Sequence, residues 1–535
     1  MKKILKTMIV FLLAIVIVVS SVFFDIPGRD TKVYASSKSK VWNGEADTSW
    51  YTGDKSSYNI STAEQLAGLA LLTNGMKDPD QFNGITINLT KDIVLNETEN
   101  FKNWDKEPPK NTWSPIGSAA SLSQYPAFGG IFNGNGHKVI GLYIDAGGYK
   151  FGDANVGLFG NVCGATIANV KIEKAYLKSY DAVGAVAGVA ERSVFINNEV
   201  SDFKAYFGEA GAGGILGKAV AAPFYPELTI YVTSLALFGI AWNPLLFFEN
   251  GESNNFKGSI LYNCKAGKLS FTHDRGSNSA GNVGGIVAVC DENGVAIVNS
   301  LVTGGTVYSA SSAGMVAPFE DDGNGRVIRN CYCYNFTLEK KSGLTKFIDA
   351  KYTKKISKAK LISKSFAKKL GDGYKWKKGK APVLKKYSIV KTGDKKEIAK
   401  TYRIIEDGYY TISDGGYIVD GNADSGGYAY ITSEENAGKY YFKYYDEGYY
   451  TITSAANGKV LELNLENDKL ISQNKFDSAK FTQRWVITTD DDQGYYIHSH
   501  FRGGFLYFDA DWMFVSGRGL IVNKDNSYKW RLGKL

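Results

Sequence analysis

Short runs in which apolar and polar residues alternate recur through the middle of the chain. ATIANVKIEKAYL, AIVNSLVTGGTV and RVIRNCYCYNFT each place an apolar or small residue at about every second position. This is the pattern of a β-strand that buries one face. Glycine-rich strings separate the runs, so the pattern predicts an all-β protein of short strands joined by tight corners.

The glycine-rich strings recur at a nearly constant spacing. They are VGLFG at 156–160, GAVAG at 184–188, GGILG at 213–217, GGIVA at 284–288 and AGMVA at 313–317, with steps of 28, 29, 71 and 29 residues. A period near 28 residues is typical of a β-solenoid, in which coils stack because no single coil can bury its inner face. GGILG is therefore predicted to be a coil corner. No Lys-Ser/Thr follows it, which argues against a phosphate-binding loop.

The strings resemble the GLUG repeat of secreted bacterial proteins, with GLFG at 157–160 the fullest match. WNGEADTSWY, FNGITINLTKDIVLN and FGGIFNGNGHKVIGLYI, which precede them, resemble the usual lead-in to such repeats. GGIVA and AGMVA depart from the repeat because they lack its last glycine. The resemblance covers about 45–390 and implies a right-handed parallel β-helix.

Helices are predicted to cover both ends of this solenoid. Ser61 and Glu64 have the spacing of a capping box. The apolar face that follows consists of Leu66, Leu69, Ala70 and Leu72. Covering the first coil would protect backbone groups that could otherwise pair with another chain. We therefore predict an N-terminal cap and first coils at 36–140 and the β-helix proper at 141–338, while LISKSFAKKLGDGYKW predicts a shorter helix at the other end.

An apolar insertion at 219–258 interrupts the repeat. Its segment 228–248, LTIYVTSLALFGIAWNPLLFF, carries no charge and is long enough to span a bilayer. Its polar residues, its proline and its position between two coils argue against a span. Two alternatives stay open: an apolar excursion packed on the flank of the solenoid, or a loop that contacts a partner or a membrane.

The N-terminal residues 1–35 resemble a signal peptide. Lysines are followed by a long apolar run, and Val-Tyr-Ala at 33–35 is a small-residue cleavage site. An uncleaved anchor is the alternative. In both cases we expect the rest of the chain to be secreted or held at the cell surface.

A strongly basic stretch follows the coils and is predicted to be an end cap and linker at 339–400. Residues 340–400 contain 21 lysines and four acidic residues. Such a segment could dock on an anionic cell-wall polymer, an acidic polysaccharide or anionic lipid. A solvated linker is an equally good interpretation, and no motif indicates nucleic-acid binding.

Three similar units make up the C-terminal residues 401–535. GYYTIS at 408, GYYTIT at 448 and GYYIHS at 494 open them, and Tyr441, Trp485 and Trp530 lie near their ends. The units resemble ricin B-type β-trefoil lectin domains, whose mark is Gln-x-Trp. Gln483 and Trp485 complete this motif, whereas the third unit keeps only Trp530. The resemblance implies that the tryptophans belong to the core.

The same resemblance implies a sugar site made of an early acidic residue, an aromatic platform and a later amide. A carboxylate can accept hydrogen bonds from adjacent hydroxyls, and an aromatic face packs on the apolar side of a sugar ring. Only the first unit keeps an aspartate at the early position. The candidate sugar-binding residues are Asp420, Asn422, Tyr428, Glu462 and Trp512.

Candidate catalytic chemistry is sparse. His-Asp-Arg at 273–275 and Glu-Asp-Asp at 320–322 are dense polar strings, but neither recurs at the solenoid period. They supply no nucleophile and base pair, so we predict no catalytic residue, metal or cofactor. The cysteines are predicted to be buried core residues rather than a disulfide framework; they are Cys163, Cys264, Cys290, Cys331 and Cys333.

These patterns predict a secreted or cell-surface carbohydrate-binding protein. The β-helix would be a stalk or platform and the trefoil a glycan-recognising head. A polysaccharide lyase or glycosidase targeted by the trefoil is the first alternative, and an adhesin that binds a host protein is the second.

Overall fold

The computed structural model describes most of residues 40–390 and 403–535. Outside this description lie 1–39, 76–81, 118–126, 147–154, 222–233, 241–257, 274–280, 391–402, 414–417, 420–430, 433–437, 464–470, 478–480, 490–493, 500–504, 509–519, 524–529 and several one- or two-residue gaps. The predicted signal peptide falls outside the described residues, and its cleavage stays a prediction.

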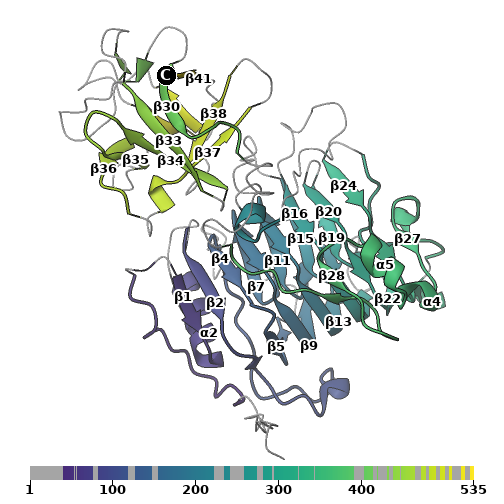
Figure 1. The fold of residues 1–535 in the computed structure, drawn as a ribbon. Coiled ribbons are helices and arrows are strands. Elements are labelled where there is room, and N and C mark those ends of the chain that lie inside the picture. Colours follow the sequence, from purple (N-terminus) through teal and green to yellow (C-terminus); the bar gives the residue numbers. More distant parts are fainter. Residues whose placement is uncertain are drawn as a thin grey trace, which may run out of the picture. The chain divides into compact units, whose positions relative to one another are not determined.

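The first part of the chain is a stack of coils whose strands pair in parallel (Figure 1). An eight-stranded sheet contains β1 (Ser57–Ile60), β2 (Thr86–Leu89), β4 (Ile131–Asn133), β8 (Thr166–Ala168), β12 (Val194–Ile196), β16 (Ser259–Tyr262), β20 (Val295–Val298) and β24 (Arg326–Arg329). An eleven-stranded sheet contains β3 (Ile93–Val94), β5 (Lys138–Ile140), β6 (Tyr143–Asp145), β9 (Lys171–Ser179), β13 (Glu199–Phe207), β17 (Lys265–His273), β21 (Leu301–Val302), β22 (Gly305–Ser309), β25 (Tyr332–Cys333), β26 (Phe336–Leu338) and β27 (Lys354–Lys355).

Two four-stranded parallel sheets complete the coils. One contains β7 (Phe159–Cys163), β11 (Ala187–Glu191), β15 (Leu216–Val220) and β19 (Val287–Cys290). The other contains β10 (Ala182–Gly184), β14 (Gly211–Gly213), β18 (Asn282–Gly284) and β23 (Ser312–Gly314). Ala187 pairs with Phe159 of one neighbouring coil and Leu216 of the other. These partners are 28 and 29 positions away, so the predicted period is confirmed, and the strands pair in parallel as a β-solenoid requires.

The string GGILG forms a corner between two of these sheets. It runs from the end of β14 to the start of β15. A Cβ atom on Gly213 would lie 1.9 Å from the carbonyl oxygen of Leu216, and one on Gly214 would lie 2.1 Å from that of Gly285. Backbones approach too closely here for any side chain, which is the physical reason for the repeated glycines.

A ladder of asparagines marks a second corner. Asn169, Asn197, Asn263, Asn299 and Asn330 all have positive φ, a conformation that asparagine tolerates better than most residues. Two steps of the ladder bond amide to amide across coils: the Nδ2 of Asn197 donates to the Oδ1 of Asn169 at 2.9 Å, and Asn330 donates to Asn299 at 2.7 Å. Between them, the Nδ2 of Asn263 donates to the hydroxyl of Tyr387 at 2.9 Å instead.

The N-terminal helix α2 (Ala63–Gly75) is present, but its cap differs from the prediction. Thr62, not Ser61, accepts the hydrogen bond of the first turn, from the backbone N–H of Gln65 at 3.2 Å. The Oε1 of Gln65 accepts from the backbone N–H of Ser61 at 2.9 Å. Gln65, not Glu64, is therefore the residue that bonds back to the start of the helix, and these two bonds go to Thr62 and Ser61. Of the predicted face, Leu66, Leu69 and Ala70 are buried and Leu72 is half-buried.

A carboxylate closes the last coil. In earlier coils the backbone N–H groups of the corner donate to the next coil; Leu216, for example, donates to the Ile286 carbonyl at 3.0 Å. The last corner, at 315–317, has no such coil beyond it. The buried carboxylate of Asp349 accepts instead from the N–H groups of Met315 at 2.7 Å, Val316 at 2.8 Å and Ala317 at 3.3 Å.

The basic segment after the coils is folded through residue 390. It contains η4 (Lys340–Ser342), η5 (Ile348–Lys351), α4 (Lys358–Leu361), α5 (Lys364–Lys369) and an antiparallel pair, β28 (Tyr374–Lys375) with β29 (Val383–Leu384). Its apolar residues Phe366 and Tyr374 pack in one cluster with Leu301 and Tyr332 of the eleven-stranded sheet. The short helix predicted within 361–376 is α5, with α4 immediately before it; Ser363 caps α5 by accepting from the N–H of Phe366.

Part of the apolar insertion packs on the flank of the coils. Leu235, Phe238 and Ile240 are buried in one cluster with Val194 and Ile260 of the eight-stranded sheet. For the described residues of the insertion, this is the excursion that the sequence left open as one alternative. No helix in the described part of the chain is long and apolar enough to cross a membrane.

The five cysteines are free thiols. Cys264, Cys331 and Cys333 are buried as predicted. Cys163 and Cys290 are only half-buried; they are the last residues of β7 and β19, the two edge strands of a four-stranded sheet. Burial raises the pKa of Cys264 and Cys331 to about 12, which keeps both as unreactive thiols.

The C-terminal residues form one antiparallel sheet of twelve strands, four to each GYY unit. They are β30 (Gly408–Ser413), β31 (Ile418–Val419), β32 (Ile431–Thr432) and β33 (Tyr440–Tyr445); β34 (Tyr449–Ser454), β35 (Val460–Leu463), β36 (Ile471–Asn474) and β37 (Trp485–Thr488); and β38 (Tyr496–Ser499), β39 (Phe505–Phe508), β40 (Leu520–Asn523) and β41 (Arg531–Lys534). The first strand β30 pairs with the last, β41, so the chain closes on itself. Within each unit the second and third strands form a hairpin.

Candidate functional site

The predicted sugar-binding residues divide into two groups. Asp420, Asn422, Tyr428 and Trp512 lie outside the described residues, so their part in a site stays a prediction. Glu462 is described and lies in β35 of the second unit. That unit therefore offers the best-defined candidate site.

Glu462 is held within the domain. Its side chain is only 7% exposed. One carboxylate oxygen accepts from the hydroxyl of Thr482 at 3.0 Å, and the other accepts from the Nε2 of Gln483 at 2.9 Å. Glu462 thereby fixes the segment that precedes β37, and its direct contact with a sugar stays untested.

Gln483 connects three segments of the second unit. Besides Glu462, its Nε2 donates to the carbonyl of Lys475 at 2.8 Å. Its Oε1 accepts from the N–H of Asp477 at 2.7 Å. The amide is fully buried, and both ends of it are bonded. This explains the glutamine of the Gln-x-Trp motif physically: it holds the turn at 475–477 against the hairpin.

The two tryptophans of the motif are core residues, as the sequence predicts. Trp485 and Trp530 are fully buried. Their indole N–H groups donate to the carbonyls of Leu461 at 3.0 Å and Leu506 at 2.8 Å, each 24 residues earlier. The second and third units therefore bury their tryptophan in the same way, which explains why a tryptophan recurs at this position.

The first unit departs from the sequence interpretation. Tyr440, not Tyr441, is fully buried at the start of β33. Tyr441 lies on the other face of the strand, where its ring packs on Tyr409 with centroids 5.0 Å apart. Alternation along a strand places only one of two neighbouring tyrosines in the core.

A stack of aromatic rings reaches the surface beside the Gln483 turn. The rings of Tyr449 and Tyr445 are nearly parallel, with centroids 4.9 Å apart and planes 13° apart. Phe476 stacks on Tyr445 at 6.2 Å and is 46% exposed. The Arg484 guanidinium lies 4.5 Å from the centre of the Tyr449 ring, at the inner end of the stack.

This stack was not predicted from the sequence. Its signal was the density of aromatic residues in YYFKYYDEGYY and the Phe-Asp pair before Gln-x-Trp, but sequence cannot show which rings meet. Phe476 lies between Lys475 and Asp477, whose backbone atoms Gln483 holds. An exposed ring on a fixed turn is a platform of the kind that packs on the apolar face of a sugar.

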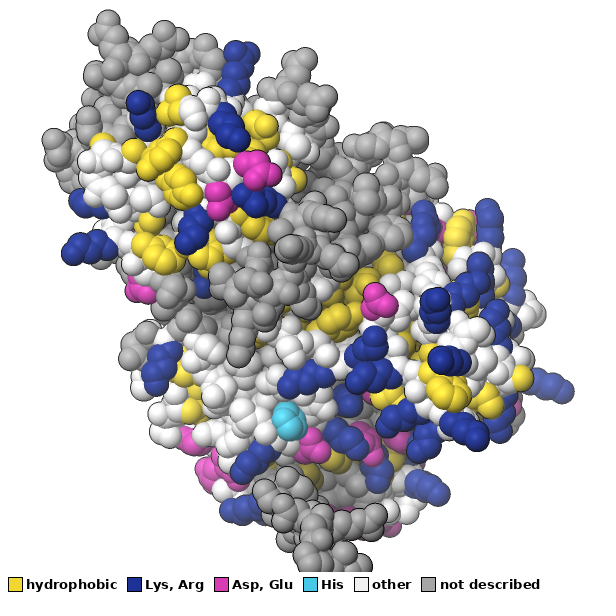
Figure 2. All heavy atoms as spheres, viewed as in Figure 1, with side chains coloured by type: hydrophobic (Ala, Val, Ile, Leu, Met, Phe, Trp, Pro, Cys, Tyr) yellow, Lys and Arg dark blue, Asp and Glu magenta, His cyan; other side chains and the backbone are white. Residues whose placement is uncertain are grey.

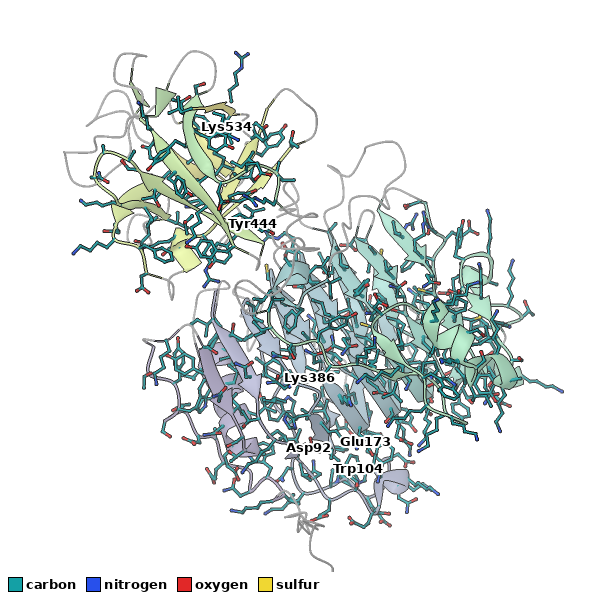
Figure 3. All side chains as sticks on the ribbon, in the orientation of Figure 1. Asp92, Trp104, Glu173, Lys386, Tyr444 and Lys534 are labelled. Carbon is teal, nitrogen blue, oxygen red and sulfur yellow. The ribbon has the colours of Figure 1, made fainter. Side chains whose placement is uncertain are left out.

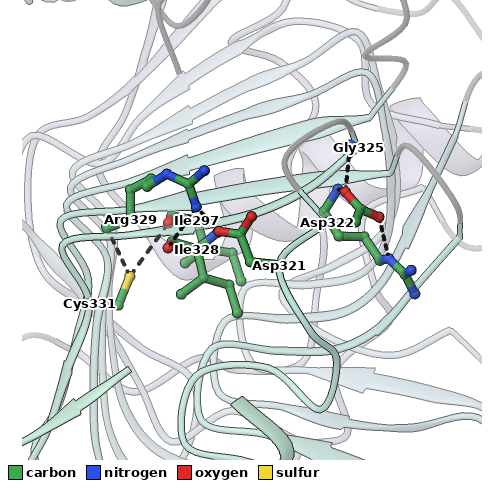
Figure 4. Close-up of polar contacts among 8 residues, drawn as sticks. Ile297, Asp321, Asp322, Gly325, Ile328, Arg329 and Cys331 are labelled. Carbon is green, nitrogen blue, oxygen red and sulfur yellow. Dashed lines mark hydrogen bonds and ion pairs between the residues drawn. The ribbon is translucent and has the colours of Figure 1, made fainter. Parts of the chain in front are cut away.

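The two aspartates of the solenoid loop at 320–322 have structural partners (Figure 4). Asp321 forms an ion pair with Arg329 and accepts from the N–H of Ile328 at 2.8 Å. Asp322 accepts from the N–H of Gly325 and the Nε of Arg326, both at 2.9 Å. These bonds close the loop before β24.

The other dense polar string has a single described member. His273 is buried, and its ring packs against Phe207 with centroids 5.4 Å apart. Asp274 and Arg275 lie outside the described residues. Over the described ranges, no group of three or more His, Cys, Asp or Glu side chains could hold a metal ion.

Comparison with protein families places the candidate site in a known domain class. A family model described as ricin-type β-trefoil lectin domain-like matches residues 436–512, which include the aromatic stack, Glu462 and Gln483. No curated protein sequence matches the chain significantly.

Three solved structures show what the chain is similar to. A designed threefold-symmetric protein, ThreeFoil, is 20% identical over 24% of this chain and 100% of its own, with a TM-score of 0.21. A Polyporus squamosus lectin bound to a human-type influenza-binding epitope is 16% identical over 25% and 50%, with a TM-score of 0.21. A Bacteroides ovatus protein with a proposed identity as an immunoglobulin A1 protease is 16% identical over 61% and 92%, with a TM-score of 0.32. From the family match, residues 436–512 are similar to ricin-type β-trefoil lectin domains.

Proposed function

We propose that this chain is a carbohydrate-binding protein and that its C-terminal residues 401–535 form a β-trefoil that recognises a glycan. The observation that carries the proposal is the match of 436–512 to ricin-type lectin domains. Twelve antiparallel strands, four to a unit, support the trefoil. In this proposal the solenoid is a stalk or platform, because one continuous core runs through its coils.

The exposed ring of Phe476 is the proposed sugar platform of the second unit. Tyr445 and Tyr449 back this ring, so little side-chain freedom is lost when a sugar packs on it. Gln483 fixes the turn beneath it. The predicted site around Asp420 in the first unit is the other candidate location within the same domain.

Glycan-array binding of the full chain tests the proposal. Replacing Phe476 with Ala should lower affinity by at least about fivefold, the effect of a contact worth more than about 1 kcal/mol. Tyr409→Ala is the matched control, because Tyr409 is 48% exposed in the same domain but packs on Tyr441 instead. Loss of binding in Tyr409→Ala but not in Phe476→Ala would place the glycan site at Tyr409 instead of Phe476. A parent protein that binds no glycan would refute the proposed function.

The same glycans also test the catalytic alternative. Release of reducing ends or unsaturated products by the full chain would make it a polysaccharide-degrading enzyme with the trefoil as its targeting module. Intact glycans after prolonged incubation support a binding protein.

We further propose that the protein is exported and held at the cell surface. The leader at 1–35 and the GLUG resemblance support this placement. N-terminal sequencing of the exported protein tests it: a mature chain that begins at Ser36 supports cleavage after Ala35, and retention in the cytoplasm contradicts export.

A further inference from the structure

Lysines on the central coils and lysines in the segment after the last coil differ in their partners. In the central coils, several lysines on the outer face pair with acids on the neighbouring coil: Lys265 lies 2.8 Å from Glu199, and Lys268 lies 3.0 Å from Asp202. Lys138 is likewise 2.7 Å from Glu173, which Figure 3 labels. These pairs neutralise part of the positive charge on the central coils, although Lys174 and Lys204 contact neutral oxygens instead.

The cap, defined here as residues 346–380, has no such compensation. All 13 of its lysines are exposed, and none forms a salt bridge with an acid in the described part of the chain. Of its two acids, Asp349 is buried in the last coil and only Asp372 is exposed. Figure 2 shows Lys and Arg side chains gathered over α4, α5 and the neighbouring β28 turn.

The cap holds these charges on a folded surface rather than on a flexible tail. Phe366 and Tyr374 anchor it in a buried cluster. Two of the lysines lie over aromatic rings, Lys351 at 5.4 Å from the centre of the Tyr352 ring and Lys355 at 5.3 Å from that of Phe347. Fixed like charges raise the local potential and attract a polyanion.

An aromatic ring lies in the middle of this charge. Trp376 is 41% exposed and stands between Lys375 and Lys377 in the chain. Its indole N–H donates to the carbonyl of Ile362 at 2.8 Å, which joins the β28 strand to the α4–α5 junction and fixes the ring. Among the described residues of the cap, Trp376 is the only large apolar side chain that is exposed.

We propose that the cap binds a linear anionic polysaccharide, with lysines contacting its carboxylate or sulfate groups and Trp376 packing on one sugar ring. In such a polymer, sugar rings alternate with negative charges. This spacing matches the cap, where the Trp376 ring is flanked in the chain by Lys375 and Lys377. A membrane surface fits less well, because one apolar side chain offers little to insert. Duplex nucleic acid offers no open ring face to Trp376.

Binding of the full chain to heparin and to polygalacturonate, with neutral dextran as the uncharged control, tests the proposal. The parent should bind both polyanions, and the affinity should fall with salt because exposed charges act over about 8 to 10 Å. Changing Lys375, Lys377 and Lys378 together to Gln should weaken binding roughly ten- to a hundredfold at low salt. The matched triple replaces Lys102, Lys106 and Lys110, exposed lysines of another loop, and should bind like the parent.

The ring is tested separately. Trp376→Ala should lower polysaccharide affinity roughly three- to tenfold, whereas Tyr308→Ala, which removes an exposed ring of the solenoid, should not. Unchanged thermal unfolding shows that each variant is folded. Equal losses in both lysine triples, an inert Trp376→Ala, or tighter binding to phosphatidylglycerol vesicles or duplex DNA would each overturn the proposal. Phe476→Ala should retain this binding, so the result stands apart from the glycan site of the C-terminal domain.

Discussion

Removing the carboxylate of Asp349 should open the last coil of the solenoid. The change Asp349→Ala leaves the backbone N–H groups of Met315, Val316 and Ala317 without their acceptor, and all three residues are buried. A buried donor without a partner costs about 1 to 3 kcal/mol. Counting mainly the two shorter bonds, at 2.7 and 2.8 Å, we expect the local free energy of unfolding to fall by about 3 kcal/mol or more.

Hydrogen exchange of a peptide that covers 315–317 measures this loss directly. A drop of about 3 kcal/mol accelerates exchange by more than about a hundredfold. Exchange of β8 and β12, which lie several coils away, should change little because coils interact mainly with their neighbours.

Asp372→Ala is the matched control, since Asp372 is an exposed aspartate of the same cap. Its effect should stay within about 0.5 kcal/mol, as for ordinary surface changes. Unchanged exchange at 315–317 in Asp349→Ala, or equal acceleration in Asp372→Ala, would refute the view that a side chain replaces the missing coil.

Three further changes test other parts of the molecule. Burial raises the pKa of Asp349 above the ordinary 3.8, so the folded state binds a proton more readily than the unfolded state. Lowering the pH from above the raised pKa to 3.8 should therefore stabilise the parent relative to Asp349→Asn. Parallel stability curves of the two proteins between pH 7 and 4 would contradict this. Trp485→Ala should destabilise the C-terminal domain by about 3 to 5 kcal/mol, seen as a lowered or lost melting transition. Asp420→Ala should keep that transition but cost about 1.5 to 3 kcal/mol of glycan affinity, measured by titration; unchanged affinity places the site elsewhere.

Periodicity alone predicted the architecture of the coils. Parallel strands, a step of 28 to 29 residues and the corner at GGILG follow from a pattern that every coil repeats. Such a pattern is local, because each coil must bury the same face and turn at the same place. The buried Trp485 and Trp530 were predictable for the same reason, since two units repeat one packing solution.

Other features required the tertiary structure, because they depend on groups that are distant in sequence and do not repeat. Asp349 is one of several acids in a basic segment until the fold brings it to the unpaired corner at 315–317. The hydrogen bond from the Gln483 amide to the Glu462 carboxylate is another case, because the two residues are 21 positions apart and no periodic pattern pairs them.

The capping residue of α2 illustrates the same limit on a short scale. Ser61 and Thr62 both fit the composition of a cap, and only the backbone geometry selects Thr62 with Gln65. Sequence thus determined where strands, corners and charges occur. Packing decided which polar groups are satisfied inside the protein and which, like the cap lysines beside Trp376, remain exposed, because a hydrogen bond or ion pair needs both groups in one place.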